Sequence, residues 1–187
     1  MLSLIKKTAL LVAFSAFCLC AQAAHFDLGR TGDLYIDAPA SWKVKSRLIE
    51  GVGYEFTFTP ANGTNAKALI TLVTQAAAKP VDPKKIDADF IQTCRPFVAA
   101  SVEKKADLRR YQLKQGYGVY AIFTDAALVE QPAKPNDYKV MAPGLIQLTD
   151  SIQALATLFA DDANGPEMAA MRAFVESLRI TPAITSS

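Results

Sequence analysis

The stretch YEFTFTP at Tyr54–Pro60 alternates cleanly between aromatic and polar side chains. Three aromatic residues share one face and a glutamate with two threonines shares the other, which predicts a half-buried strand. The turn signal Asn62–Gly63 follows, and then the β-rich segment KALITLVTQ at Lys67–Gln75, which is apolar on both faces. These two segments predict an antiparallel hairpin, and so an antiparallel sheet.

Other segments extend this sheet. DLYIDAP is a short strand that ends at Pro39, and LRRYQLKQG alternates before the turn at Gln115–Gly118. VYAIFTDAAL returns from that turn as one strand. YKVMAPGLIQLT and SIQALATLFADD then predict a second hairpin around Thr149–Ser151.

Two segments have helical spacing. Asp82–Pro83 is a helix start, with a capping carboxylate and a proline at the first position, and the helix runs to about Val102. Pro96 lies inside it and is expected to kink or divide it. The second helix starts at Pro166, capped by Asn164 or Gly165, and shares Met171, Phe174, Val175 and Leu178 on one face.

The predicted order is β-β-β-α-β-β-β-β-α. We therefore expect an α+β fold, with an antiparallel sheet of about six or seven strands covered by two main helices. A first strand ending in APASW, two more strands, a helix, a strand meander and a last helix reading FVESLRI resemble the family of the nuclear import factor Mog1 and the photosystem subunit PsbP. Bacterial members of this family include DcrB-like periplasmic proteins. The resemblance covers about Leu34 to Ile180 and implies a sandwich scaffold, no catalytic signature and a binding or assembly function.

The N-terminus predicts a secretory signal peptide. Two lysines precede an eleven-residue apolar run, Ala9–Leu19, and Ala21 with Ala23 fit the A-x-A pattern of a cleavage site. We expect cleavage after Ala23 or Ala24 and a periplasmic or secreted protein. Cys18 and Cys20 follow bulky residues, so a lipoprotein is not expected, and both cysteines would leave with the signal peptide.

The predicted organisation is a signal peptide over 1–24, a loose lead-in over 25–32, one α+β domain over 33–182 and a tail over 183–187. Loss of Lys6 and Lys7 reduces the 20 basic residues to 18, which equals the number of acidic ones. A neutral chain is not typical of nucleic-acid binding. We expect no integral membrane segment after cleavage, no cofactor, and a monomer or weak oligomer.

The residue inventory argues against catalysis. His25 is the one histidine and falls at the expected mature N-terminus, where we expect it to be mobile. Cys94 has Arg95 beside it but lies on the apolar stripe of the first helix, so we interpret it as a small buried hydrophobe. An enzyme that uses only carboxylates is the least favoured hypothesis, and Asp125 and Asp161 are its candidate acids.

Metal sites are not predicted either. His25 at a free N-terminus could bind copper weakly, but the chain has no second histidine to complete a site. The stretch FADDANGPE carries Asp161, Asp162, Asn164 and Glu167, which could bind calcium, but it does not match the calcium-loop pattern. We interpret it as a strand end followed by a helix cap.

The sequence therefore favours a non-catalytic binding or assembly factor that acts through protein–protein contacts. The alternative is a carrier of a small apolar ligand, in a pocket between sheet and helices lined by aromatics such as Phe56, Phe58 and Tyr120. Trp42, just after Pro39, is interpreted as a structural ring buried against the sheet edge. The Pro-rich loop is the candidate binding segment because loops often carry function; its candidate residues are Val129, Gln131, Pro132, Pro135, Asn136 and Tyr138.

Overall fold

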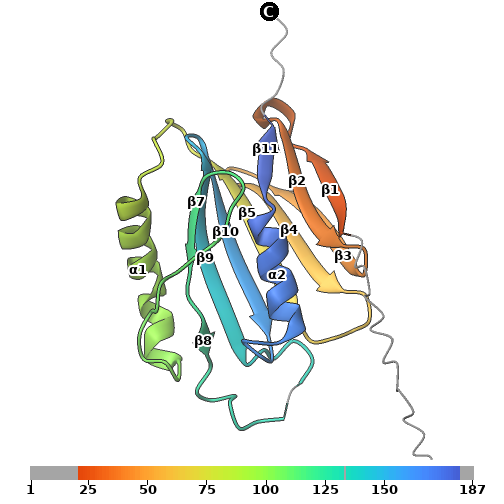
Figure 1. The fold of residues 1–187 in the computed structure, drawn as a ribbon, viewed down its shortest axis with the longest axis vertical. Coiled ribbons are helices and arrows are strands. Elements are labelled where there is room, and N and C mark those ends of the chain that lie inside the picture. The colour runs from red at the N-terminus through yellow and green to blue at the C-terminus, as the bar shows by residue number, and fades with distance from the viewer. Residues whose placement is uncertain (1–20, 133, 182–187) are drawn as a thin grey trace, which may run out of the picture.

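The computed structural model describes residues 21–132 and 134–181. Within these ranges the strands form two antiparallel sheets (Figure 1). The smaller sheet has the order β1-β2-β11 and contains β1 (Ala21–Asp27), β2 (Asp33–Pro39) and β11 (Arg179–Thr181). The larger sheet has the order β3-β4-β5-β10-β9-β7-β6, with β8 paired to β9; it contains β3 (Trp42–Ile49), β4 (Gly53–Pro60), β5 (Lys67–Thr74), β6 (Arg109–Arg110), β7 (Tyr117–Tyr120), β8 (Phe123–Thr124), β9 (Val140–Thr149) and β10 (Ile152–Ala160).

The helices α1 (Pro83–Ala100) and α2 (Pro166–Glu176) lie on opposite faces of the larger sheet. Neighbouring residues of β9 show this, because Leu145 packs in the cluster under α1 and Ile146 packs in the cluster under α2. The smaller sheet covers the α2 face as well (Figure 1). In the described part of the chain, no helix combines the length and the apolar character needed to cross a membrane.

The predicted α+β fold is confirmed, and β4 buries the aromatic face that the sequence predicted. Phe56 and Phe58 are 1% and 0% exposed and form part of the main core. The turn at Asn62–Gly63 joins β4 to β5, as predicted. The strands form two sheets rather than the one that was expected, because DLYIDAP pairs as β2 in the smaller sheet. The larger sheet still has eight strands, since the polar segment after Trp42 pairs as the edge strand β3 and one expected strand is split in two.

The starts of both helices were predicted correctly. Asp82 caps α1, where its carboxylate accepts hydrogen bonds from the N–H groups of Lys84 and Lys85. Gly165 occupies the cap position of α2, with Pro166 at the first turn. Pro96 was expected to kink or divide the first helix; the helix is not divided, because α1 continues through Pro96 to Ala100. Packing of the apolar face on the sheet keeps the helix in one piece despite the lost hydrogen bond.

The expected strand VYAIFTDAAL is split into β7 and β8, and Pro143 of β9 explains why. The register continues across the gap, since Tyr120 pairs with Gly144 and Phe123 with Met141. Between them, the N–H of Ala121 donates to the carbonyl of Pro143 over 3.2 Å. The reciprocal bond is missing because proline has no N–H, so the ladder is interrupted at this pair.

The lead-in over 25–32 is not loose in the structure. His25 lies in β1, opposite Tyr35 of β2, and the two rings stack with centroids 5.0 Å apart. Its Nε2 atom lies 3.1 Å from Asp33 Oδ1. The expectation of a mobile histidine is therefore wrong. The polar sequence carried no strand signal, because an edge strand is held by backbone hydrogen bonds and does not require a continuous apolar face.

Candidate functional site

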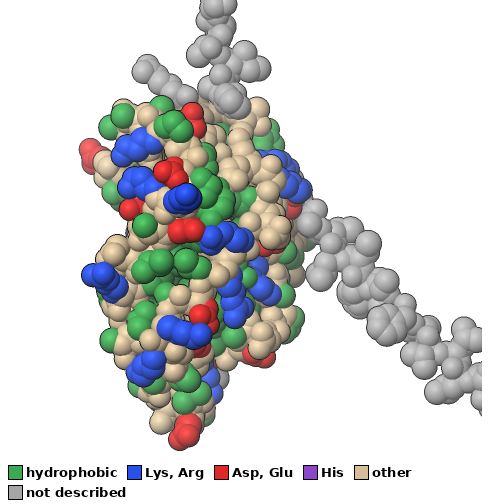
Figure 2. Space-filling view, turned by 60° about the vertical axis from the view of Figure 1, so that its left-hand side comes forward, with side chains coloured by type: hydrophobic (Ala, Val, Ile, Leu, Met, Phe, Trp, Pro, Cys, Tyr) green, Lys and Arg blue, Asp and Glu red, His purple; other side chains and the backbone are tan. Residues whose placement is uncertain are grey.

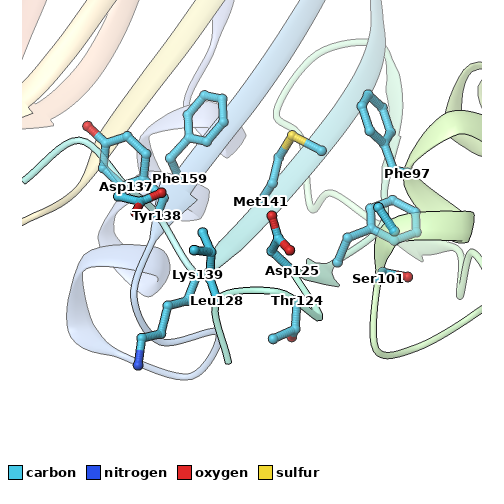
Figure 3. A pocket seen from close by; sticks show the side chains of 12 residues that line it. Phe97, Ser101, Thr124, Asp125, Leu128, Asp137, Tyr138, Lys139, Met141 and Phe159 are labelled. Atoms are coloured by element: carbon cyan, nitrogen blue, oxygen red, sulfur yellow. The ribbon is translucent and has the colours of Figure 1, made fainter. Parts of the chain in front are cut away.

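A cavity of about 270 Å³ lies where the C-terminal end of α1 meets β8, β9 and β10. Figure 3 shows side chains from all these segments converging on it. An apolar concavity with a few polar groups is typical of a binding site. We call this cavity the aromatic pocket. Its lining residues are Phe97, Ala100, Ser101, Phe123, Thr124, Asp125, Leu128, Asp137, Tyr138, Lys139, Met141 and Phe159.

The floor of the aromatic pocket is a row of three apolar side chains on neighbouring strands. Phe123 pairs with Met141, and Met141 pairs with Phe159, in antiparallel register. Directly opposite residues point to the same face with Cβ atoms about 5 Å apart, so the three side chains form one surface. Phe123 is 3% exposed, whereas Met141 and Phe159 are half-buried.

The last turn of α1 forms one wall. The ring centroid of Phe97 lies 5.9 Å from that of Phe123. Ser101 ends the helix, and its N–H donates to the carbonyl of Phe97. The N–H of Val102 then donates to the carbonyl of Thr124, which attaches the helix end to β8. The wall is therefore held by backbone hydrogen bonds on both sides of the cap.

The end of the Pro-rich loop forms the opposite wall. The Tyr138 ring lies 5.3 Å from the Phe159 ring, and the Lys67 ammonium lies 5.2 and 5.1 Å from the two ring centres. Burial raises the pKa of Tyr138, and the charge of Asp161 raises it further, so the hydroxyl stays neutral. Leu128, earlier in the loop, lines the pocket too.

The residues predicted from sequence as a binding loop are divided by the structure. Tyr138 lines the aromatic pocket and also a neighbouring cavity of about 450 Å³, where Pro135 and Asn136 join it. The remaining three residues line neither of these two cavities and are exposed. They are Val129, Gln131 and Pro132.

Asn65, in the turn between β4 and β5, holds this loop in place. Its side-chain Nδ2 donates to the carbonyl of Lys134 over 3.1 Å and lies 3.0 Å from Asp161 Oδ1. Its Oδ1 accepts from the N–H of Asn136 over 3.0 Å. Asn136 has a φ of 65°, a conformation that asparagine tolerates better than most residues. One amide side chain thus fixes the wall that carries Tyr138.

Two acids lie near β8: Asp125 lines the pocket, and Glu103 lies just outside the lining, beside Thr124. Glu103 accepts from the N–H and the hydroxyl of Thr124, both over 2.8 Å. Burial acts to raise the pKa of Glu103, but these hydrogen bonds outweigh it and hold the pKa below its ordinary value. Asp125 follows Thr124 directly and is exposed. Its Oδ1 accepts from the N–H of Ala127 over 2.8 Å.

The aromatics proposed for a ligand pocket are core residues instead. Phe56 contacts Phe26, with ring centroids 4.5 Å apart, and Phe58 contacts Phe174 at 5.0 Å. Tyr120 is 5% exposed and packs on another buried tyrosine. These aromatic residues fill the core between sheet and helix, and the aromatic pocket lies at the margin of the sheet instead.

Trp42, Pro39 and Cys94 lie away from the aromatic pocket. Trp42 opens β3 and is half-buried, with its ring edge-on to Phe174 of α2 at 5.3 Å. Together with Pro39 it also borders a shallow hollow of about 220 Å³. Cys94 lies on the buried face of α1, and burial raises the pKa of its thiol to about 11.

The candidate metal and acid residues are used in structural contacts. Asp161 accepts from Asn65 through both oxygens, and Asp162 accepts from the N–H of Asn164. Among the residues that the structure describes, no group of three His, Cys, Asp or Glu side chains is placed to hold a metal ion. Asp125 is the one of the two candidate acids that lines the aromatic pocket.

Sequence reasoning missed the floor and the helix wall of this pocket. Met141 and Phe159 alternate with core residues on β9 and β10, and they lie on the face that carries α1, beside its last turn. The signal available in the sequence was that β9 and β10 carry apolar residues on both faces. Packing on a single core requires apolar residues on only one face, so the second apolar face needs another explanation.

No protein-family model and no curated protein matches this chain at a significant level. The structure is similar to that of the cyanobacterial PsbP protein (CyanoP) from Synechocystis sp. PCC 6803, solved in solution. The TM-score is 0.51, with 9% sequence identity, and the alignment covers 86% of this chain and 94% of that chain. At this identity the likeness concerns the fold. The chain has a PsbP-like α+β fold.

Proposed function

We propose that this chain is an exported, non-catalytic binding or assembly factor that acts through protein–protein contacts in the periplasm. In this proposal the aromatic pocket takes an apolar side chain of the partner protein. The carrying observation is the half-buried floor of Met141 and Phe159 between two fixed walls, Phe97 on α1 and Tyr138 on the loop that Asn65 holds. Preorganised apolar pockets that receive one side chain are typical anchors of protein interfaces.

The size of the pocket favours a side chain over a free ligand. Its volume is about 270 Å³. Pockets that bury most of a drug-sized molecule usually measure about 300–1,000 Å³. A carrier of a small apolar ligand is the second candidate, supported by the apolar lining. Native mass spectrometry of protein purified from its source separates the two: a co-purified small mass favours the carrier.

The chemistry of the described residues supports a binding function as well. Cys94 is the reactive residue type that a hydrolase could use, but it is buried and its thiol pKa is raised to about 11. His25 contacts Asp33 and Tyr35 on the smaller sheet. Neither residue lines the aromatic pocket. A nucleophile needs a base within hydrogen-bond reach.

The compartment and the family belong to the same proposal. The signal-peptide pattern before Ala24 supports export, and the APASW and FVESLRI segments support distant membership of the Mog1/PsbP-like family with its DcrB-like bacterial members. The face of the molecule in Figure 2 shows Lys and Arg side chains at separate places with Asp and Glu between them. This mixed charge supports a protein partner rather than nucleic acid.

The test is a cross-linking pull-down from the native envelope with two matched variants. Ala100 lines the pocket and is exposed, so Ala100→Trp places an indole in it. Ala99 is an exposed neighbour outside the lining, so Ala99→Trp adds the same ring elsewhere. We expect Ala100→Trp to reduce partner capture at least about tenfold, as for a blocked anchor pocket, and Ala99→Trp to leave it unchanged. Equal capture by both variants would overturn the proposal.

A further inference from the structure

One carboxylate of the aromatic pocket is directed inward. Figure 3 shows the Asp125 side chain pointing toward Met141, between the Phe97 wall and the Tyr138 wall. The Asp125 N–H donates to the carbonyl of Lys139, and its Oδ1 accepts from the N–H of Ala127. These bonds fix the direction of the side chain, because a turn of this kind holds the carboxylate against its own backbone.

The lysines near the pocket do not pair with Asp125, so its carboxylate is available to a ligand. Lys139 extends its amine away from the floor in Figure 3, and its Nζ lies 3.5 Å from the carbonyl of Val129. The Lys67 ammonium lies over the rings of Tyr138 and Phe159, at the opposite end of the pocket. Within the described residues, no lysine or arginine forms an ion pair with Asp125.

The pocket lining contains two acids, Asp125 and Asp137, and one base, Lys139, while Glu103 lies just outside it. Glu103 is bonded to Thr124, next to Asp125, and its lowered pKa keeps it ionised. Asp137 lines the pocket from the loop. Because the Lys139 amine is directed away from the floor and Lys67 lies at the opposite end, the acids near Asp125 favour a positive charge at this end of the floor and disfavour a negative one.

We propose that the partner segment bound in the aromatic pocket is basic: it places an apolar side chain on the Met141–Phe159 floor and an adjacent arginine or lysine against Asp125. This inference rests on the proposed function, since it names the chemistry of the partner at the same site. The floor gives most of the affinity through burial of apolar area. Asp125 gives selectivity, because an acidic neighbour on the partner would be repelled by the acids at this end.

The experiment uses three dipeptide probes and the purified, isotope-labelled protein. The probes are N-acetyl-Phe-Arg-amide, N-acetyl-Phe-Gln-amide and N-acetyl-Phe-Glu-amide, titrated to millimolar concentration at low salt. Binding is followed by NMR through the amide signals of Phe97, Thr124 and Met141. The variants are Asp125→Asn and the control Glu50→Gln, which changes an exposed acid in the β3–β4 turn, at the other end of the sheet.

We expect the Phe-Arg probe to bind about fivefold more tightly than the Phe-Gln probe, the upper range for an exposed ion pair. The preference should disappear in Asp125→Asn, remain in Glu50→Gln and weaken in high salt. Equal binding of the basic and neutral probes, or a preference that survives Asp125→Asn, would overturn this inference while leaving the pocket as an apolar anchor site. If no probe shifts the pocket signals, the proposed function itself fails.

Discussion

Cys94 shows how burial decides the chemistry of one residue. It lies on the inner face of α1 with 0% exposure, and desolvation raises the pKa of its thiol to about 11. The thiolate is the reactive form, and it is scarce well below that pH. We expect native protein at pH 8 to resist iodoacetamide for hours, and urea-unfolded protein to be alkylated within minutes, as measured by intact mass. Rapid alkylation of the folded chain would contradict this picture.

Trp42 connects the start of β3 to α2 through its contact with Phe174. Its ring is half-buried, so replacement removes less apolar area than in a full core position. We expect Trp42→Ala to lower the free energy of unfolding by about 2–3 kcal/mol, near the lower end for large-to-small core changes. Urea unfolding measures this.

Trp42→Phe is the matched control, since it keeps an aromatic ring against Phe174 and should lose less than half as much stability. A Trp42→Ala variant with unchanged stability and lost partner capture would reassign the residue to binding. The sequence indicated the structural interpretation from Pro39 and the following turn. It could not supply the partner ring, which lies 132 positions further along the chain.

At the scale of elements, the loop that carries Tyr138 depends on one turn far away in sequence. Asn65 bonds to the Lys134 carbonyl, the Asn136 N–H and the Asp161 carboxylate. We expect Asn65→Ala to speed hydrogen exchange of residues 134–138 about tenfold, the effect of losing one or two net hydrogen bonds. Hydrogen-exchange mass spectrometry measures this.

Asn62→Ala is the control for this loop prediction. Asn62 lies in the same turn and bonds to Thr64, and its side chain forms no hydrogen bond to residues 134–138. Its replacement should leave exchange in residues 134–138 unchanged. If both variants loosen the loop equally, the turn as a whole, rather than the Asn65 amide, holds the wall of the pocket.

The sequence predicted those elements whose signal is local. The cap at Asp82, the β4 alternation and the Thr149–Ser151 hairpin depend on neighbouring residues, and all three are present. The split between β7 and β8 was missed because its cause, Pro143, acts across the sheet. The candidate site was missed for the same reason, since α1, β8, β9 and the loop meet there from distant parts of the chain.

At the scale of the whole molecule, Asp37 joins the smaller sheet to the rest. It forms ion pairs with Arg179 of β11 at 3.1 Å and with Lys114, before β7, at 3.3 Å. Burial acts to raise the pKa of Asp37, but the hydrogen bonds and charges of both partners outweigh it, so the pKa lies below its ordinary value. The ionised form is therefore favoured by folding.

The sign of the pH dependence follows from this lowered pKa. The stabilisation from Asp37 is complete above the pKa of the unfolded chain, about 3.9, and is lost as the pH falls through the lower folded value. We expect Asp37→Asn to be less stable than the unmodified protein by about 1 kcal/mol at pH 7, with the difference shrinking below about pH 3. Urea unfolding at both pH values measures it.

Asp107→Asn is the control for Asp37, since Asp107 pairs with Lys105 at an exposed position. It should change stability little at either pH. A pH-independent difference for Asp37→Asn would show that the side chain acts through packing rather than through its charge.

The first strand of the smaller sheet has a consequence for the order of events during maturation. β1 begins at Ala21, so residues 21–23, which pair with β2, lie on the N-terminal side of both cleavage positions predicted from sequence. A protease that cuts there needs this segment extended and free of other partners. Processing and folding would then compete for the same few residues, and a precursor that folds first would protect its own cleavage site. If cleavage comes first, it leaves backbone groups of β2 at Ile36–Pro39 open to a new strand.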